Sequence, residues 1–277
     1  MGYVFRRQGK LQEAVAALRQ AGDLDPRNAT LLVNLGETLA LVRDVAGATR
    51  WLDRSTALTP DWARPYGLKA RYVLRLSGDV AGAGTSLTSA ASLGVAEDHE
   101  VAYAAILLAL STRSYQSGLH RLIVETHDSF DNQFWFVPKT LLQAQLHGLL
   151  GQREAELSHC RAAAALLEAR IRNTPDDARF HGSVGVAYAG LGRKADAVRE
   201  GKRALELMPV AKEAYRGAFR VEEMARIYAM VGERDAAVEQ LEYLMSIPFD
   251  LAAPGLRLDP TWDSLRDHPR FQKLVGR

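Results

Sequence analysis

The chain has 277 residues, of which 47% are hydrophobic and 25% are charged, a composition typical of a folded globular protein. Its 35 Lys and Arg residues nearly balance its 33 Asp and Glu residues, and the net charge of +2 argues against a polybasic nucleic-acid arm or an acidic tail. The single cysteine, Cys160, excludes an intrachain disulfide and a zinc site built on several cysteines.

The N-terminal residues lack the apolar core of a signal peptide, and two arginines follow within the first seven positions. The longest apolar run, Val101 to Leu110, has ten residues, half of the roughly 20 that a membrane-spanning helix needs. We therefore predict no membrane span in this chain. We expect a cytoplasmic location, or a periplasmic one if a larger parent protein carries an upstream span.

Prolines recur along the chain with a spacing of 34 residues, from Pro26 to Pro60 and from Pro175 to Pro209. Small residues, Gly and Ala, precede Pro26 and Pro209 at matching distances. A fixed period of this length indicates an internal structural repeat, in which each unit buries its apolar face against its neighbours.

These residues resemble the tetratricopeptide repeat, a helix–turn–helix unit in which Leu35-Gly36 and Val184-Gly185 would occupy positions 7 and 8. Position 8 then falls, at intervals of 34, 35, 35, 38, 41 and 40 residues, on Gly2, Gly36, Arg71, Ile106, Ala144, Gly185 and Ala225. The resemblance implies an all-α superhelical solenoid of about seven repeats. Their expected bounds are residues 1–28, 29–63, 64–98, 99–136, 137–177, 178–217 and 218–250.

Packing considerations support the same architecture. Small residues at positions 8, 20 and 27 let two helices approach closely, and Leu32, Leu35 and Leu39 supply an apolar stripe for each helix to bury. No alternating strand pattern of useful length is present. The segments Thr59-Pro60-Asp61 and Thr174-Pro175-Asp176 predict helix starts, with threonine as N-cap and proline in the first turn.

Two repeats depart from the common pattern. The first lacks its initial six positions, so we expect the chain to be a truncation or the tail of a longer reading frame, and its apolar surface to pair with a second copy. In the fifth repeat, residues 162–171 lengthen the second helix by about two turns.

The last segment, residues 251–277, is predicted to cap the solenoid. A terminal repeat leaves an apolar face exposed, and a short amphipathic element can cover that face. The apolar residues with helix-like spacing in this segment are Trp262, Leu265, Phe271 and Leu274.

Three segments are more specific than generic repeats: residues 131–138 (DNQFWFVP), 228–248, and 256–271, which begins LRLDPTWD. They resemble the C-terminal repeat region of bacterial signalling proteins in which a TolB-like segment precedes tetratricopeptide repeats. In that family the N-terminal effector is an adenylate or guanylate cyclase, a winged-helix regulator or a protein kinase. The resemblance implies that this chain is the C-terminal module of such a protein, without its effector domain.

No residue pattern indicates catalysis or metal binding. The seven histidines include no HExxH motif, and the closest grouping, His127-Asp128 with Asp131, suits a turn better than a metal site. Cys160 falls at a helix-packing position, which predicts a buried, inert thiol. We therefore predict that the chain is not an enzyme and holds no cofactor or metal.

In this repeat class the first helices of successive repeats line a concave groove. The register predicts a partner groove formed by Arg6, Asn34, Glu37, Lys69, Tyr72, Arg75, Tyr103, Gln145, Arg179, Glu222 and Arg226. Aromatic and arginine side chains often dominate binding energy, and this set suits a peptide with some negative charge. Tyr72 and Tyr103 could equally pack within the solenoid. A chaperone-type carboxylate clamp is not predicted, because only Asn34 and Lys69 match its positions over repeats one to three.

The predicted function is therefore a protein–protein interaction scaffold that binds a peptide or protein segment in its groove. The alternative is a cis-regulatory or sensory module that controls an upstream effector. Nucleic acid is not expected as a partner, because the charge is nearly balanced and no basic stripe is evident.

Overall fold

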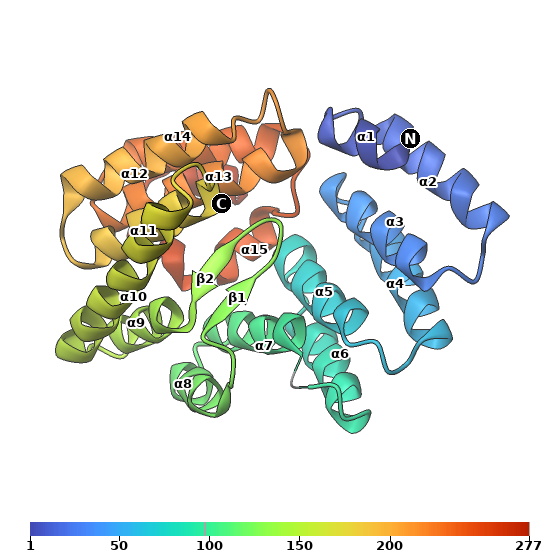
Figure 1. Ribbon diagram of the computed structural model, residues 1–277, viewed down its shortest axis with the longest axis horizontal. Helices are drawn as coiled ribbons and strands as arrows, with labels where there is room; N and C mark the ends of the chain where they lie inside the picture. Colours follow the sequence, from blue (N-terminus) through green and yellow to red (C-terminus); the bar gives the residue numbers. More distant parts are fainter. Residues whose placement is uncertain (97, 277) are drawn as a thin grey trace. The chain divides into compact units, whose positions relative to one another are not determined.

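The computed structural model describes residues 1–96 and 98–276, and most of them lie in helices joined by tight turns (Figure 1). The helices follow one another as pairs, which confirms the predicted all-α repeat fold. These pairs are α1 (Gly2–Arg7) with α2 (Leu11–Leu24), α3 (Ala29–Leu41) with α4 (Val45–Leu58), α5 (Arg64–Tyr72) and its π-helical extension η1 (Val73–Ser77) with α6 (Val80–Ser92), α7 (His99–Ser111) with α8 (Tyr115–Val124), α9 (Lys139–Leu149) with α10 (Arg153–Asn173), α11 (Ala178–Gly190) with α12 (Lys194–Leu207), and α13 (Ala214–Met230) with α14 (Arg234–Ser246).

Shorter elements complete the fold. A two-stranded antiparallel hairpin, β1 (Ser129–Asp131) and β2 (Phe136–Pro138), lies between the fourth and fifth helix pairs in sequence. The C-terminal elements are α15 (Ala253–Leu258), the 3-10 helix η2 (Pro260–Leu265) and α16 (Pro269–Leu274). Within residues 1–96 and 98–276, no helix is both long enough and apolar enough to cross a membrane.

The turn inside each helix pair contains one residue with a left-handed backbone, with φ between 59° and 81°. Glycine adopts this conformation without steric cost, whereas other residues rarely do so. One such residue follows each predicted position 8 at a distance of seven residues along the chain, so the intervals between them are the predicted ones. These residues are Gly9, Arg43, Gly78, Arg113, Gly151, Gly192 and Gly232. The backbone thus supports the count of about seven repeats independently of side-chain pattern.

The chain forms two compact units. The first contains Met1–Arg113 together with Ile247–Asp259, and the second contains Ser114–Ser246 together with the residues from Pro260 onward. The fourth helix pair is divided, with α7 in the first unit and α8 in the second. The predicted division between residues 250 and 251 therefore does not coincide with a boundary between these units.

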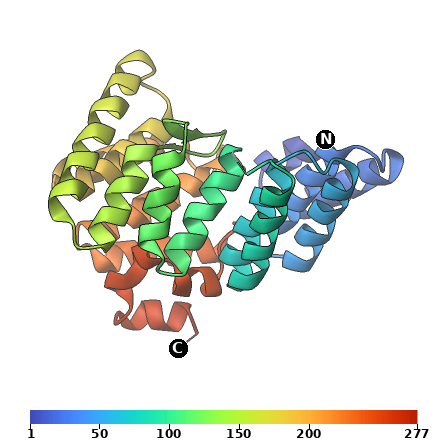
Figure 2. The same cartoon turned by 90° about the horizontal axis from the view of Figure 1, so that it is seen from below.

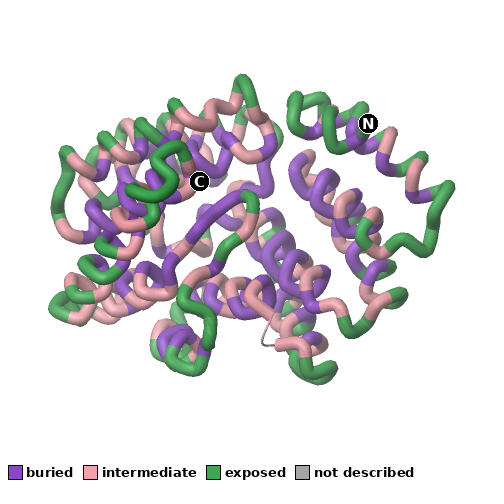
Figure 3. Tube along the Cα trace, viewed as in Figure 1, coloured by how far each residue is buried: buried purple, intermediate pink, exposed green. Residues whose placement is uncertain are grey.

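The core of the first unit is built from the predicted leucine stripe. Leu32, Leu35, Leu39 and Leu52 are at most 1% exposed, and the inner turns of α3 and α5 are buried in Figure 3. Gly36 lets α3 and α4 approach, because a Cβ atom there would lie 3.1 Å from the Leu52 side chain. The small residue at position 8 thus performs the close-packing role that its position predicts.

In the second unit the same role falls to Gly185 and Ala197, on α11 and α12. A Cβ atom on Gly185 would lie 3.0 Å from the Ala197 carbonyl oxygen, and Ala197 itself is fully buried. The helix α10 has 21 residues, which confirms the predicted lengthening of the fifth repeat.

The C-terminal residues from Pro260 onward cover the last repeat. Trp262, Leu265 and Phe271 are fully buried, η2 contacts α13 and α14, and α16 contacts α14. Figure 2 shows this red C-terminal part lying against the orange helices of the same unit. The expected cap is therefore present over residues 260–276, whereas α15 belongs to the first unit.

The predicted helix starts at Thr59 and Thr174 are wrong. Both threonines instead end the preceding helices, α4 and α10. The Thr59 hydroxyl donates to the carbonyl oxygen of Ser55 in α4 at 3.1 Å, so its hydrogen bond is made to the preceding helix and not to the following one. The following helix α11 starts from Asp177, whose carboxylate accepts the backbone N–H of Arg179.

Candidate partner-binding surface

The first three predicted groove residues form a buried polar network in the first unit. The Arg6 guanidinium lies 3.5 Å from the Glu37 carboxylate, and it also donates to the Asn34 side chain at 3.3 Å. Arg64 donates to the other Glu37 oxygen at 2.6 Å. These contacts join α1, α3 and α5. Because Arg6 and Glu37 are only 5% and 1% exposed, little of either side chain is available to a partner.

A non-helical segment of the chain itself, Ile247–Leu251, lies against the first unit's helices. Arg43 donates to the Leu251 carbonyl oxygen at 2.9 Å and to the Ile247 carbonyl oxygen at 3.0 Å. Arg75, a predicted groove residue, donates to the Asp250 carbonyl oxygen at 3.1 Å. Two arginines therefore hold the backbone of this segment along its length.

The side chain of Asp250 is the electrostatic centre of this contact. It is 1% exposed and lies 3.2 Å from the Arg71 guanidinium and 3.4 Å from that of Arg75. Burial opposes the charge on Arg71, but the Asp250 carboxylate, with Tyr72 and Glu100, raises the pKa of Arg71 overall. The buried Arg71 guanidinium therefore stays ionised beside the Asp250 carboxylate.

The helix α15, labelled in Figure 1, continues this contact against η1. The Ala252 backbone N–H donates to the Arg75 carbonyl oxygen at 3.1 Å. Gly255 packs so closely that a Cβ atom there would lie 2.3 Å from the same oxygen. Only glycine permits this approach of the two backbones.

Two irregularities in the repeat pattern signal this arrangement in the sequence. Arg71 stands at position 8, where the repeat favours a small residue, and it is the residue that pairs with Asp250. Arg43 adopts the left-handed conformation that five other repeats assign to glycine, and its side chain holds the segment. The repeat pattern alone does not predict that either residue binds this segment.

Three further predicted residues of the first unit have separate environments. Lys69 is half-buried and pairs with the exposed Asp53 at 2.5 Å. Tyr72 is 2% exposed and packs within the first unit, the alternative that the sequence left open. Tyr103 is partly buried on α7.

In the second unit the β-hairpin inserts an aromatic loop against α13. The Phe134 ring lies 4.6 Å from the Tyr215 ring and 4.9 Å from the Phe219 ring, and Trp135 lies 5.4 Å from Phe219. Below them, the Ser183 hydroxyl of α11 donates to the Phe136 carbonyl oxygen. The hairpin therefore covers the inner helices of this unit with aromatic side chains.

The predicted groove residue Arg179 lies at this hairpin, and Glu222 lies on α13. Arg179 pairs with Asp177 at 2.6 Å and with Asp131 of β1 at 2.8 Å. Glu222 is 8% exposed. Arg179 therefore anchors the hairpin to α11, and Glu222 is largely withdrawn from solvent.

A buried charge pair lies beneath the hairpin. Arg220 is fully buried, donates to the Phe134 carbonyl oxygen, and pairs with Glu223 at 2.9 Å. Burial raises the pKa of Glu223 to about 7, although Arg220 and Arg226 oppose the shift. Glu223 thus titrates near neutrality.

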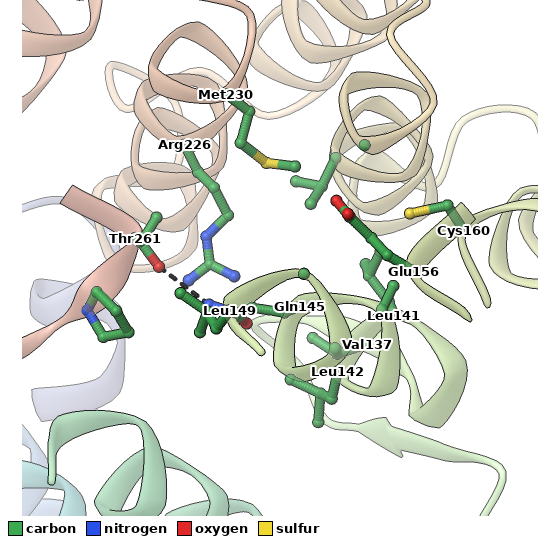
Figure 4. Close-up of a pocket in the computed structure, with 15 residues that line it drawn as sticks. Val137, Leu141, Leu142, Gln145, Leu149, Glu156, Cys160, Arg226, Met230 and Thr261 are labelled. Atoms are coloured by element: carbon green, nitrogen blue, oxygen red, sulfur yellow. Dashed lines mark hydrogen bonds between the residues drawn. The ribbon is translucent and has the colours of Figure 1, made fainter. Parts of the chain in front are cut away.

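The remaining predicted residues, Gln145 and Arg226, line one cavity of about 220 Å³ in the second unit (Figure 4). Its wall comes from α9, α10, α11, α13 and the start of η2, and much of it is apolar, including Leu141, Leu142 and Met230. The structure therefore brings together two groove residues that are 81 positions apart in sequence.

The residues considered for chemistry have ordinary structural partners. His127 pairs with Glu125 at 2.6 Å. Burial raises the pKa of the Cys160 thiol to about 11, so the thiol stays protonated. Across residues 1–96 and 98–276, no three His, Cys, Asp or Glu side chains are grouped so as to hold a metal ion.

Comparisons with known proteins match two parts of the chain to one kind of repeat. Family models described as TPR repeat and Tetratricopeptide repeat match residues 2–41 and 149–215. A tetratricopeptide repeat protein from Parabacteroides merdae has a TM-score of 0.50 at 16% identity, covering all of this chain and 96% of its own. The chain folds as a tetratricopeptide-repeat solenoid.

A second solved structure, that of the APC/C hetero-tetramer Cut9-Hcn1, has a TM-score of 0.52 at 14% identity. The match covers 100% of the present chain and 48% of the matched chain in that structure. No curated protein matches the sequence. At these identities the structures establish the tetratricopeptide-repeat fold alone, which is in general a scaffold for protein–protein interaction.

Proposed function

We propose that this tetratricopeptide-repeat protein is an interaction scaffold whose inner helices bind an extended, acidic segment of a partner protein. One observation supports this: the repeats of the first unit already hold the non-helical segment Ile247–Leu251. Arginines there bind backbone carbonyls and a carboxylate, while Phe249 and Leu251 are buried beside them. A partner segment with one acid between apolar residues would use the same chemistry.

Of the eleven predicted groove residues, seven keep part of their surface accessible: Asn34, Lys69, Arg75, Tyr103, Gln145, Arg179 and Arg226. Arg6, Glu37, Tyr72 and Glu222 are buried, so they would support the surface rather than contact a partner. We propose that the accessible residues, mostly cationic, select an acidic segment. The proposal assigns no catalytic step to the chain.

Selection of displayed peptides on the purified chain, followed by titration of those enriched, tests this function. We expect the selection to enrich peptides that carry an acidic residue between apolar residues. Their affinity should fall about tenfold or more when Lys69→Gln or Arg179→Gln removes a charge-assisted contact. Arg50→Gln is the control, because Arg50 is exposed on α4 and lies outside the predicted groove. Enrichment without any acidic preference, or equal losses in all three variants, would contradict the proposal.

The alternative is a cis-regulatory or sensory role as the C-terminal module of a cytoplasmic bacterial signalling protein. The resemblance of residues 131–138 and 256–271 to TolB-like/tetratricopeptide-repeat proteins supports it, and the two segments form the aromatic hairpin and much of α15, η2 and the start of α16. The genomic sequence upstream of the Met1 codon tests this role. A continuous frame encoding a cyclase, winged-helix or kinase domain is expected, and a stop codon directly before Met1 would contradict it.

Self-association through the first repeat is a further proposal. Met1, Tyr3 and Val4 are between 44% and 81% exposed, which leaves apolar surface at α1 for a second copy. Sedimentation equilibrium should show an apparent mass that rises with protein concentration. The Val4→Lys variant should keep the mass of the monomer at all concentrations. A mass independent of concentration would rule the association out.

A further inference from the structure

The cavity of the second unit contains an arginine whose charge has no direct partner. Arg226 reaches from α13 into the cavity wall, and across the described part of the chain its guanidinium makes no hydrogen bond or ion pair. The Glu223 carboxylate, whose pKa is raised by burial and lowered by the charges of both Arg220 and Arg226, is already paired with Arg220 at 2.9 Å. A guanidinium in this state is a ready donor for a planar carboxylate.

The polar groups of the cavity are separated by sign. Figure 4 shows Arg226 on the same side as Gln145 and Thr261, whereas Glu156 and Cys160 lie on the other side. Glu156 is paired with Arg153 at 2.8 Å, and the Cys160 thiol stays neutral. One end of the cavity therefore attracts an anion, and the other end would repel a second one.

The middle of the cavity suits a hydrocarbon chain rather than a peptide backbone. Leu141, Leu142 and Met230 contribute apolar wall, and the Gln145 amide already donates to the Thr261 hydroxyl at 3.1 Å. A peptide would bring backbone N–H and C=O groups that this wall leaves without partners.

The volume of the cavity also limits the size of a ligand that it can enclose. Its volume of about 220 Å³ equals that of about seven water molecules at about 30 Å³ each, which is close to the size of a six-carbon acid. A larger drug-sized ligand would need a cavity of roughly 300 Å³ or more.

We propose that this cavity binds a short aliphatic monocarboxylate, with the carboxylate on Arg226 and the hydrocarbon chain along the leucine wall. The site needs no protein partner, so it goes beyond the proposed scaffold function, and its failure would leave that function untouched. Of the seven accessible groove residues, Arg226 and Gln145 would then serve this cavity, and the other five would remain available to a partner segment.

Titration of the full chain with hexanoate tests the site, with binding followed by calorimetry and by the NMR signal of the Met230 methyl group. Hexanoate should saturate the protein and shift that signal. Hexanamide has the same shape without the charge, and adipate places a second carboxylate near Glu156. Each should bind at least about tenfold more weakly than hexanoate.

Variants locate the carboxylate. Arg226→Gln should weaken hexanoate about tenfold or more and leave hexanamide unchanged, while Arg226→Lys should retain part of the affinity. Glu156→Gln should improve adipate selectively. Arg161→Gln, an exposed residue of α10 outside the cavity, is the matched control and should change nothing.

Several results would overturn the proposal. They are no saturable binding of hexanoate to the wild-type chain, equal affinity for hexanamide, or equal losses in the Arg226 and Arg161 variants. Tighter binding of an acetylated tripeptide ending in leucine than of hexanoate would also overturn it, because the pocket would then recognise a polypeptide C terminus.

Discussion

Both units use the same helix-pair repeat, and in each a non-repeat segment packs on the helices, but the chemistry of the contact differs. In the first unit Asp250 and the backbone around it are held by Arg43, Arg71 and Arg75. In the second unit Phe134 and Trp135 pack on aromatic rings of α13. The repeat therefore supplies a common frame, while residues that depart from its pattern decide what each surface holds.

The ion pair of the first unit should show the largest effect. Asp250→Ala leaves Arg71 buried without its main partner, and we expect a loss of about 3–5 kcal/mol in the free energy of unfolding. Hydrogen exchange should locate the loss to residues 1–113 and 247–259. Asp53→Ala, which breaks the exposed pair with Lys69, should cost at most about 1 kcal/mol. Similar losses in both variants would remove the special role of Asp250.

Aromatic packing in the second unit should come next. Phe134 is 4% exposed among three rings, so Phe134→Ala should destabilise this unit by about 3 kcal/mol. Phe134→Leu keeps an apolar side chain and should cost less than about 1.5 kcal/mol. Denaturant unfolding measures both values. Because no charge is removed, the loss should vary little with salt, and a strong salt dependence would argue against the contrast between the units.

Close helix packing is common to both units and should have an intermediate effect. Ala197→Leu places a large side chain against Gly185, and we expect a loss of about 1–3 kcal/mol, measured by thermal unfolding. Ala195→Leu is the control, because Ala195 is exposed on the same helix and should change stability by less than about 0.5 kcal/mol. Equal effects at the two positions would mean that helix approach does not depend on the small residue.

The last prediction concerns the pH dependence of stability at the charge pair beneath the hairpin, where the effect per pH unit is small. The folded pKa of Glu223 is about 7 and its ordinary value is 4.5, so the folded state retains the proton longer than the unfolded state. The contribution of Glu223 to the free energy of unfolding is therefore fully present below pH 4.5 and is lost as the pH rises through 7. The free energy should fall by at most about 1.4 kcal/mol per pH unit over this range. Glu223→Gln should flatten that slope in pH-dependent denaturation. Exposed Glu206→Gln should preserve it.

Much of the fold follows from residues within one period. The proline spacing, the small residues at Gly36, Gly185 and Ala197, and the turn glycines identify about seven helix pairs, because each feature acts on adjacent helices. The aromatic C-terminal residues likewise predict a cap over the last repeat. The fully buried Trp262 and Phe271 agree with that prediction.

The candidate surface was less predictable. The register assigned Arg6, Glu37 and Tyr72 to an open groove, but ion pairs and packing with neighbouring repeats bury them. The register also gave no reason for the large residue Arg71 at a position for small ones. Its partner Asp250 lies far along the chain, and repeat periodicity carries no information about such contacts.

By itself the sequence determined the repeat, its register, the all-α class and the aromatic residues of the cap, since helix pairing depends on neighbours about 34 residues apart or closer. Tertiary structure decided which segment covers each surface and which groove residues stay accessible. It placed Asp250 against Arg75, 175 residues away, and gathered Gln145 and Arg226 around one cavity. The physical reason is that local packing is encoded within each repeat, whereas long-range contacts depend on the path of the whole chain.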